Sequence, residues 1–381
     1  MFLTNQDVVD VVGWRRKLHS QPEISGEETA TAAEVQAFMS QTGPDQIVAG
    51  LGGTGVAVVY AGAAPGPTVM FRAELDALPI EELSDAPHRS LIDGKAHLCG
   101  HDGHMAILAA LGRGLGRTRP ERGRVVLMFQ PAEENGAGAA AVIADPEFAK
   151  VTPDFVFSLH NIPGIAFGEV ELREGLANCA SRGMRVVLTG KTAHAAAPET
   201  GISPMRAVAS LMPALTALRS GTFPQDDFAM ATVTHAAMGE PAFGIAPGRA
   251  EIWTTLRTAS DGLMQQLCAR AEALVQEAAS DAGLGHSISY HDVFVHCENQ
   301  PEAVAHLRRA LYAEGVRHSP GEPLRASEDF GRFGSAGKSA MFFLGAGERH
   351  ASLHNPDYDF PDDLIPIGAR IFMRAVRDLL G

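Results

Sequence analysis

The chain has 381 residues and a formal net charge of −14, with 45% hydrophobic and 20% charged residues, which predicts a globular protein of two domains rather than one. Surfaces that bind nucleic acid or anionic membranes need clustered Lys and Arg, and the lack of such clusters argues against both partners. We expect a cytoplasmic protein, because no run reaches the ~18 apolar residues of a membrane helix and the first residues lack a secretory pattern.

Strands and helices alternate in the first 160 residues. Apolar or β-branched runs at 55–60, 68–72, 124–130 and 155–160, and a later one at 340–344, predict buried strands. Helical patterns occupy 28–39 and 103–115, so we expect an α/β domain with a mostly parallel central sheet flanked by helices. Residues 50–55 match the G-x-G-x-x-G dinucleotide fingerprint, but a strand rather than a helix follows, which favours a glycine-rich hairpin.

A different order of elements at 182–296 predicts an inserted domain. A strand at 184–190, a helix at 204–220, strands at 228–234 and 250–257, a helix at 261–279 and a strand at 287–295 follow one another. This βαββαβ order is a ferredoxin-like unit. We therefore expect one domain formed by residues 1–181 and 297–381, with a helix at 301–314, and a second domain of residues 182–296 inserted into it.

Polar side chains follow three of the predicted strands. The strand at 68–72 precedes Glu74 and Asp76, the strand at 124–130 precedes Glu133 and Glu134, and the strand at 155–160 ends on His160. Because the carboxyl ends of parallel strands meet at one edge of a sheet, these side chains should converge. Two adjacent glutamates cannot both bind one ion with good geometry, so we expect one to bind metal and the other to take a proton from water.

The segment CGHDGH offers a thiol and an imidazole two residues apart. The glycine between Cys99 and His101 lets the backbone bend so that both point at one ion, and this pair suits Zn²⁺ and neighbouring divalent metals. Taken alone, the segment is better explained by a buried cysteine and by histidines that cap the next helix. With His160, Glu134 and the late His354 as further candidates, the metal interpretation is favoured.

Long motifs are spread over nearly the whole chain. They are RRKLHSQPEISGEET, FRAELDALPIEE, GKAHLCGHDGH, FQPAEENGAGA, LHNIPG, GKTAHAAAPETGISP, ASEDFGRF and ASLHNPDYDF. In these motifs the chain resembles the metal-dependent aminoacylase-like amidohydrolases, which include hippurate hydrolases, indole-acetyl-amino-acid hydrolases and N-acetyl-diaminopimelate deacetylases.

The resemblance implies a site for two divalent metals with Cys99 as the bridging ligand. His101 and His160 would complete the protein ligands of one ion, and Glu134 and His354 those of the other. Zn²⁺ or Mn²⁺ is the expected metal, with Co²⁺ or Ni²⁺ as alternatives, because affinity alone does not decide which ion occupies such a site.

The resemblance also implies roles for residues that do not bind metal. Glu133 would act as general base and later as acid, and Asp76 would support the ligands from behind. His194 of the inserted domain would stabilise the oxyanion, in this subunit's site or a partner's. Arg257 and Gly345 are the expected substrate-binding residues, Arg257 through the substrate carboxylate. The inserted domain would serve as a lid and as the interface of a homodimer.

These implications lead to one expected reaction and two alternatives. The expected reaction is metal-dependent hydrolysis of the amide bond of an N-acyl amino acid to a carboxylic acid and an amino acid. A dipeptidase or aminopeptidase would need an acidic partner for a free amine, for which Glu74 and Glu199 are candidates; the third possibility is a silent binding protein. The departures from the family pattern, all expected near the substrate, are Glu74, Glu199, Ser203 and Gly244.

Overall fold

A computed structural model describes residues 2–381 and divides the chain into two compact units. The first unit consists of Met1–Ala177, Cys297–Glu322 and Asp329–Gly381, and the second of Asn178–His296 and Pro323–Glu328. None of the helices within residues 2–381 combines the length and apolar composition that a bilayer crossing requires.

The first unit contains a large sheet and most of the helices. Its helices are α1 (Asn5–His19), α2 (Thr29–Ser40), α3 (His101–Arg117), α4 (Gly138–Ala144), α7 (Pro301–Ala313) and α8 (Leu364–Leu380), with 3-10 turns η1 (Pro146–Lys150) and η3 (Asp329–Ser335). Its strands are β1 (Gln46–Leu51), β2 (Gly55–Ala61), β3 (Ala64–Glu74), β4 (Arg122–Gln130), β5 (Phe155–Pro163), β6 (Val170–Glu171), β7 (Gly175–Asn178, ending at the unit boundary), β14 (Cys297–Asn299), β15 (His318–Ser319) and β16 (Lys338–Gly347).

Eight strands form the large sheet in the order β1-β2-β4-β3-β5-β16-β6-β15. The four central strands, β4, β3, β5 and β16, pair in parallel, whereas β1 and β2 add an antiparallel edge. The prediction of a mostly parallel sheet flanked by helices is therefore confirmed. The register pairs Glu74 with Gln130 and Arg72 with Ser158, so the carboxyl ends of β3, β4 and β5 lie in one row, as their polar residues predict.

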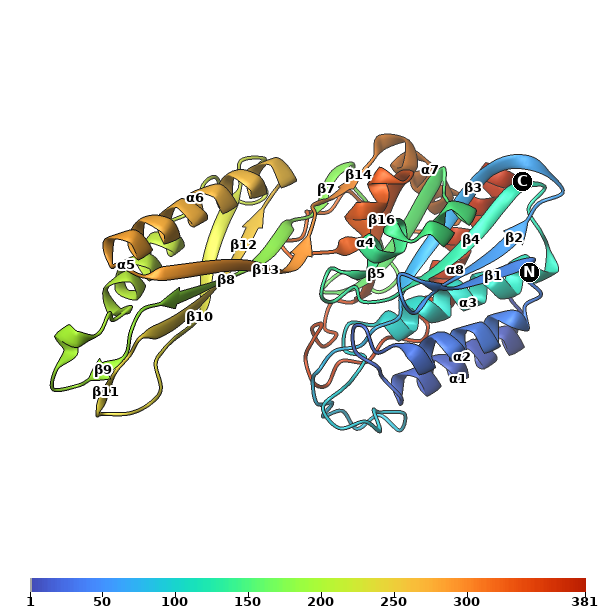
Figure 1. Ribbon diagram of the computed structural model, residues 1–381. Helices are drawn as coiled ribbons and strands as arrows, with labels where there is room; N and C mark the ends of the chain where they lie inside the picture. Colours follow the sequence, from blue (N-terminus) through green and yellow to red (C-terminus); the bar gives the residue numbers. More distant parts are fainter. Residues whose placement is uncertain (1) are drawn as a thin grey trace. The chain divides into compact units, whose positions relative to one another are not determined.

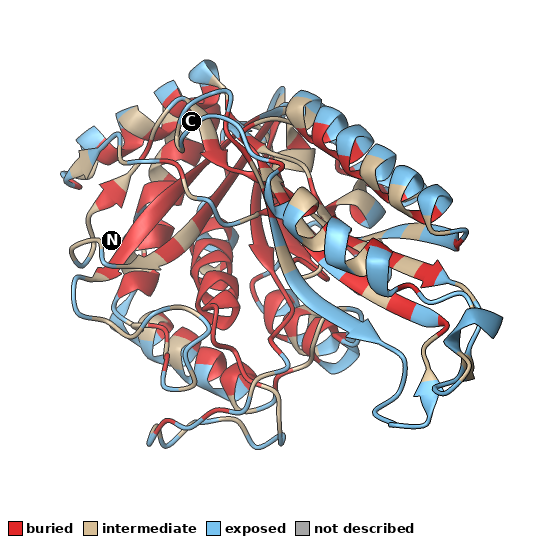
Figure 2. Cartoon of the chain, turned by 90° about the vertical axis from the view of Figure 1, so that its left-hand side faces the viewer, coloured by how far each residue is buried: buried red, intermediate tan, exposed pale blue. Residues whose placement is uncertain are grey.

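The apolar runs that predict strands become the core of this unit. In Figure 2 most of the length of the central strands of the large sheet is coloured as buried. Figure 1 shows α1, α2 and α3 together on one face, and α3 also packs against α8. Phe372 of α8 lies 4.7 Å from Phe71 of β3 and 5.7 Å from Phe342 of β16 between ring centroids. Each such aromatic pair contributes about 0.5–1.5 kcal/mol beyond its buried area.

The second unit has its own sheet and its own hydrophobic core. Its elements are β8 (Ala180–Thr189), β9 (Ala193–His194), the 3-10 turn η2 (Pro198–Thr200), α5 (Met205–Thr216), β10 (Ala229–Met238), β11 (Ile245–Ala246), β12 (Arg249–Thr258), α6 (Asp261–Asp281) and β13 (Gly285–Phe294). Four strands pair in the antiparallel order β10-β12-β8-β13, and α5 and α6 pack against this sheet. This is the ferredoxin-like βαββαβ arrangement that the order of the elements predicts.

Candidate metal centre

The turn before α3 places a thiol and an imidazole on the same side of the backbone. Gly100 has a φ of +91°, and a Cβ atom there would lie 2.3 Å from Oδ1 of Asn161, so only glycine fits. The turn leaves Cys99 just before α3 and His101 in its first turn, two residues earlier than the predicted helix start. Both side chains are almost completely buried.

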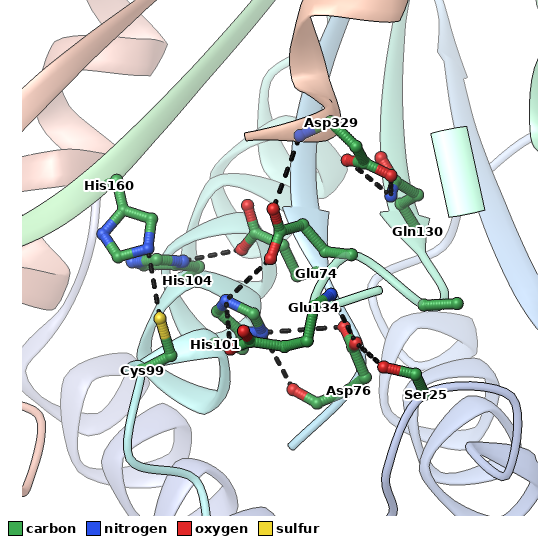
Figure 3. A network of polar contacts seen from close by, with 12 residues as sticks. Ser25, Glu74, Asp76, Cys99, His101, His104, Gln130, Glu134, His160 and Asp329 are labelled. Atoms are coloured by element: carbon green, nitrogen blue, oxygen red, sulfur yellow. Dashed lines mark hydrogen bonds and ion pairs between the residues drawn. The ribbon is translucent and has the colours of Figure 1, made fainter. Parts of the chain in front are cut away.

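Five side chains of the first unit bring metal-binding atoms together. The Cys99 sulfur lies 3.4 Å from Nε2 of both His160 and His354. Oε1 of Glu134 lies 3.8 Å from Nε2 of His101 and 3.8 Å from Nε2 of His354. Figure 3 shows His160 above the Cys99 sulfur and His101 close to Glu134. Loops and strand ends that are distant in the sequence therefore contribute one cluster of donors.

Hydrogen bonds fix which ring nitrogen of His101 and of His160 faces the cluster. Nδ1 of His101 donates to the carbonyl oxygen of Asp76 at 2.8 Å, and Nδ1 of His160 donates to that of Asn161 at 2.8 Å. In the neutral imidazole, the form that binds metal, each Nε2 then carries the lone pair. Nε2 of His101 is buried without a hydrogen-bond partner and faces carboxylate oxygens. A cation between these groups would satisfy both, so the residues fit a metal site.

The protein environment strongly affects the ionisation of these donors. Burial raises the pKa of the Cys99 thiol well above its usual range. Burial also lowers the pKa of His160 to about 3, which keeps its imidazole neutral. A neutral imidazole is the form that binds metal, and a divalent cation stabilises the thiolate that burial disfavours. His354 is the one ligand candidate with an exposed side chain, so the cluster opens to solvent there.

Asp76 supports the backbone beside the donor cluster, whereas the carboxylate of Glu133 borders the cluster itself. Asp76 is fully buried, and its Oδ2 accepts hydrogen bonds from the Ser25 hydroxyl at 2.7 Å and the Glu134 N–H at 3.0 Å. Asp76 therefore fixes the backbone of Glu134. Glu133 is 6% exposed, and its Oε2 lies 4.0 Å from Nε2 of His101. Its carboxylate borders the cluster, where it can reach a water molecule or substrate.

A buried polar network behind the cluster was not predicted from the sequence. Nδ1 of His104 donates to Oε2 of Glu74 at 2.6 Å, and Nε2 of His104 lies 2.6 Å from Oδ1 of Asn161. Arg72 pairs with the other oxygen of Glu74 and, at 2.6 Å, with Asp329. Because Glu74 is fully buried with both oxygens engaged, it does not line a substrate wall and is not positioned to bind a substrate amine.

A second buried cluster joins α1 to the start of α3 and to the loop before α8. Arg15 is fully buried and donates to Asp102 at 3.1 Å, Asp359 at 2.6 Å and Asp362 at 2.9 Å. His19 donates to Asp102 at 2.9 Å from Nδ1, and its Nε2 lies 3.3 Å from a Glu82 oxygen. Asp102 follows His101 directly, so this arginine cluster holds the first turn of α3.

The arginine cluster predicts a pH-dependent stability. Burial alone would lower the pKa of His19, but the Asp102 charge and the hydrogen bonds to Asp102 and Glu82 outweigh burial and raise that pKa to about 9. Protonation therefore stabilises the fold fully below pH ~6.5, and this contribution, on the order of 3 kcal/mol, is lost as the pH rises through about 9. Urea unfolding of metal-free protein at pH 6 and pH 9.5 should show the decrease, and His19→Gln should reduce it. His286 is exposed, and His286→Gln should leave the decrease in stability between pH 6 and pH 9.5 as large as in wild type. If wild type, His19→Gln and His286→Gln lost the same stability between these pH values, His19 would not be the titrating group.

The remaining predicted residues are not among the five donors. His194 is exposed on β9, where it pairs with Ile245 of β11, and Arg257 on β12 donates to Ser327 at 3.0 Å; all four belong to the second unit. Gly345 is buried in β16, and a Cβ atom there would lie 2.0 Å from the carbonyl oxygen of Ala166. Packing alone thus explains this glycine, and its contact with substrate stays a prediction.

The sequence and the fold are similar to those of known hydrolases. The family model of peptidase family M20/M25/M40 matches residues 70–378. N-acetyl-L-cysteine deacetylase of Bacillus subtilis is 31% identical, over 97% of this chain and 88% of the relative, and hippurate hydrolase of Campylobacter jejuni is 30% identical over 94% of each. A solved structure of the Bacillus subtilis YXEP protein, described as a dinuclear metal binding peptidase, shares the fold with a TM-score of 0.82, 23% identity and 99% coverage of both chains. The chain belongs to peptidase family M20/M25/M40.

Proposed function

We propose that this protein hydrolyses the amide bond of N-acyl amino acids, with two divalent metals bound by the five-donor cluster. One observation carries the proposal: Glu133, a buried carboxylate outside the two donor groups that contain Cys99, has its Oε2 atom 4.0 Å from Nε2 of His101. A general base beside a metal site is what hydrolysis requires. Relatives of similar length that are described as an N-acetyl-L-cysteine deacetylase, a hippurate hydrolase and IAA-amino acid hydrolases support the same reaction.

The donors fit two ions that share one ligand. Cys99, His101 and His160 form one group and Cys99, Glu134 and His354 another, with all donor atoms of a group within 4.8 Å of one another. Cys99 would bridge the ions. Bound metals of this kind polarise a substrate carbonyl and lower the pKa of water to about 7. The thiolate favours Zn²⁺, and Mn²⁺, Co²⁺ and Ni²⁺ are the other ions we expect to support activity.

Residues that do not bind metal have separate roles in the proposed reaction. Glu133 takes a proton from the water that adds to the acyl carbon and delivers it to the leaving nitrogen, so the products are a carboxylic acid and an amino acid. Asp76 holds the Glu134 backbone. His194 would stabilise the oxyanion, and Arg257 and Gly345 would contact the amino-acid portion. We also propose a cytoplasmic homodimer formed through the second unit.

A substrate screen tests the reaction class. Purified protein loaded with Zn²⁺ or Mn²⁺ should release amino acid from at least one of the N-acetyl, N-benzoyl and longer N-acyl amino acids, and a chelator should abolish the release until metal is restored. Matching free dipeptides should be turned over at least tenfold more slowly. A preference for the dipeptides would indicate a peptidase, and inactivity on both sets despite full metal loading would indicate a binding protein.

A further inference from the structure

The loop that carries Glu133 contains a residue in the left-handed conformation. Ala132 has a φ of +50° and is 8% exposed. This conformation costs a residue with a Cβ atom about 1–2 kcal/mol, so other contacts must hold the loop in place. Ala132 directly precedes Glu133, and its backbone torsion sets the direction in which the Glu133 side chain leaves the loop.

The contact that holds Ala132 comes from a distant part of the chain. Glu28, at the start of α2, is fully buried, and its Oε1 accepts a hydrogen bond from the Ala132 N–H at 2.9 Å. The same oxygen accepts from the Gly26 N–H at 2.8 Å, and Oε2 accepts from the Thr54 hydroxyl at 2.9 Å. Three donors from three segments satisfy the buried carboxylate. Bonds to a charged acceptor are about twice as strong as neutral ones.

Other bonds fix the loop on the far side of Ala132. The carbonyl oxygen of Ala132 accepts from the Gly138 N–H at 3.0 Å, and that of Glu133 accepts from the Gly136 N–H at 2.8 Å. The Glu134 N–H is held by Asp76, as Figure 3 shows. Glu28 therefore supplies the bond on the amino-terminal side of the loop, where the strained torsion lies.

We infer that Glu28 is a positioning residue for Glu133: its carboxylate holds the strained Ala132 and thereby keeps the base aimed at the donor cluster. The inference rests on the proposed function, in which Glu133 moves the proton. A displacement of about 1 Å at a reacting group can lower a rate about 100-fold. Loss of the hydrogen bond between Glu28 and Ala132 should therefore reduce kcat more than it changes KM.

Three substitutions at position 28 separate positioning from simple stability. Glu28→Ala removes the acceptor and should lower kcat about 10- to 100-fold, with KM changed less than about threefold. Glu28→Gln can keep an oxygen facing the Ala132 N–H while the Thr54 hydroxyl turns to accept from the new amide, so kcat should stay within about threefold. The aspartate side chain of Glu28→Asp is too short to reach the Ala132 N–H, so kcat should fall in this variant too. Glu28→Asp replaces Glu28→Ala in the test if the alanine variant does not fold.

A second change at Ala132 tests the strain directly. Glycine adopts positive φ without the steric cost that a Cβ atom brings. Adding Ala132→Gly to Glu28→Ala or Glu28→Asp should therefore restore kcat up to about tenfold, equivalent to about 1.4 kcal/mol. A residue needed only for folding would not be rescued in this way.

Glu23→Ala is the matched control. Glu23 lies in the same amino-terminal segment, and its carboxylate accepts from the backbone and hydroxyl of Thr31 at 2.7 and 2.9 Å, on α2 rather than on the loop. This variant should lower the melting temperature but keep kcat within about twofold. Metal content, measured by elemental analysis, should stay at the wild-type value in every variant, because Glu28 bonds to no metal-ligand candidate.

Hydrogen exchange gives a readout independent of activity. Peptides covering residues 131–136 should exchange faster in Glu28→Ala than in wild-type or Glu28→Gln protein, and unchanged exchange would overturn the inference. Wild-type kcat in Glu28→Ala, or no rescue by Ala132→Gly, would overturn it as well. If the wild-type protein hydrolyses no N-acyl amino acid, the proposed function fails, and exchange alone then decides whether Glu28 holds the loop.

Discussion

Glu133→Gln should lower kcat for N-acyl amino acid hydrolysis by about 10²–10⁴-fold while the protein retains its metal. The amide has nearly the same size as the carboxylate but cannot accept the proton of the attacking water at neutral pH. The Glu133 side chain is buried, with Oε1 3.4 Å from the Asp329 N–H, and glutamine can accept that same bond, so the fold should persist. The measurements are steady-state kinetics and elemental analysis of the same preparation.

The control for this prediction replaces a glutamate outside the cluster. Glu147→Gln removes an exposed carboxylate that pairs with Lys150, and its kinetics should match wild type. If Glu133→Gln were as active as wild type on an N-acyl amino acid, Glu133 would not be the base. Loss of metal together with activity would instead identify Glu133 as a ligand.

Cys99→Ala should lose metal as well as activity. The sulfur lies 3.4 Å from the Nε2 atoms of two histidines and is the one donor shared by both groups, so its removal weakens both ion sites. Groups that only orient ligands cost 10–100-fold in metal affinity when removed, and a bridging ligand should cost more than 100-fold. Dialysis against a buffered free-metal series, followed by elemental analysis, measures the affinity.

The same substitution should abolish stabilisation by metal. A ligand at 100 times its Kd stabilises the native state by about 2.7 kcal/mol, so adding Zn²⁺ should raise the melting temperature of wild type but not of Cys99→Ala. Cys297→Ala, which removes another buried cysteine of the first unit, should respond to Zn²⁺ as wild type does. An equal response in all three proteins would mean that Cys99 is not a ligand.

The strand ends could be predicted because their signal is local. An apolar run that ends in Glu74, Glu133 or His160 gives both the strand and its polar end, and the parallel order of the sheet then places these ends together. The first turn of α3 was less predictable, since the helical pattern begins at residue 103 whereas the left-handed turn at Gly100 starts the helix at His101. The division of the chain at residues 181 and 296 stays a prediction.

The supporting residues could not be predicted because their partners are far away in the sequence. Nothing near Arg15 indicates that it pairs with Asp359 and Asp362, which lie 344 and 347 residues further on. Glu28 looks like an ordinary acidic residue at a helix start, and its bond to Ala132 spans 104 residues. The partners of such buried charged residues are set by tertiary packing, and local sequence patterns do not predict them.

The separation of the donors along the chain has a consequence during synthesis. Cys99 and His354 are 255 residues apart. The hydrogen bond from the His354 N–H to the Leu98 carbonyl oxygen, at 2.8 Å, likewise cannot form until His354 has been synthesised. At about 5–20 residues per second, a ribosome needs roughly 10–50 s to make that interval. A nascent chain therefore carries Cys99, His101, Glu134 and His160 long before His354 is made, so the group that contains His354 is completed only late in synthesis.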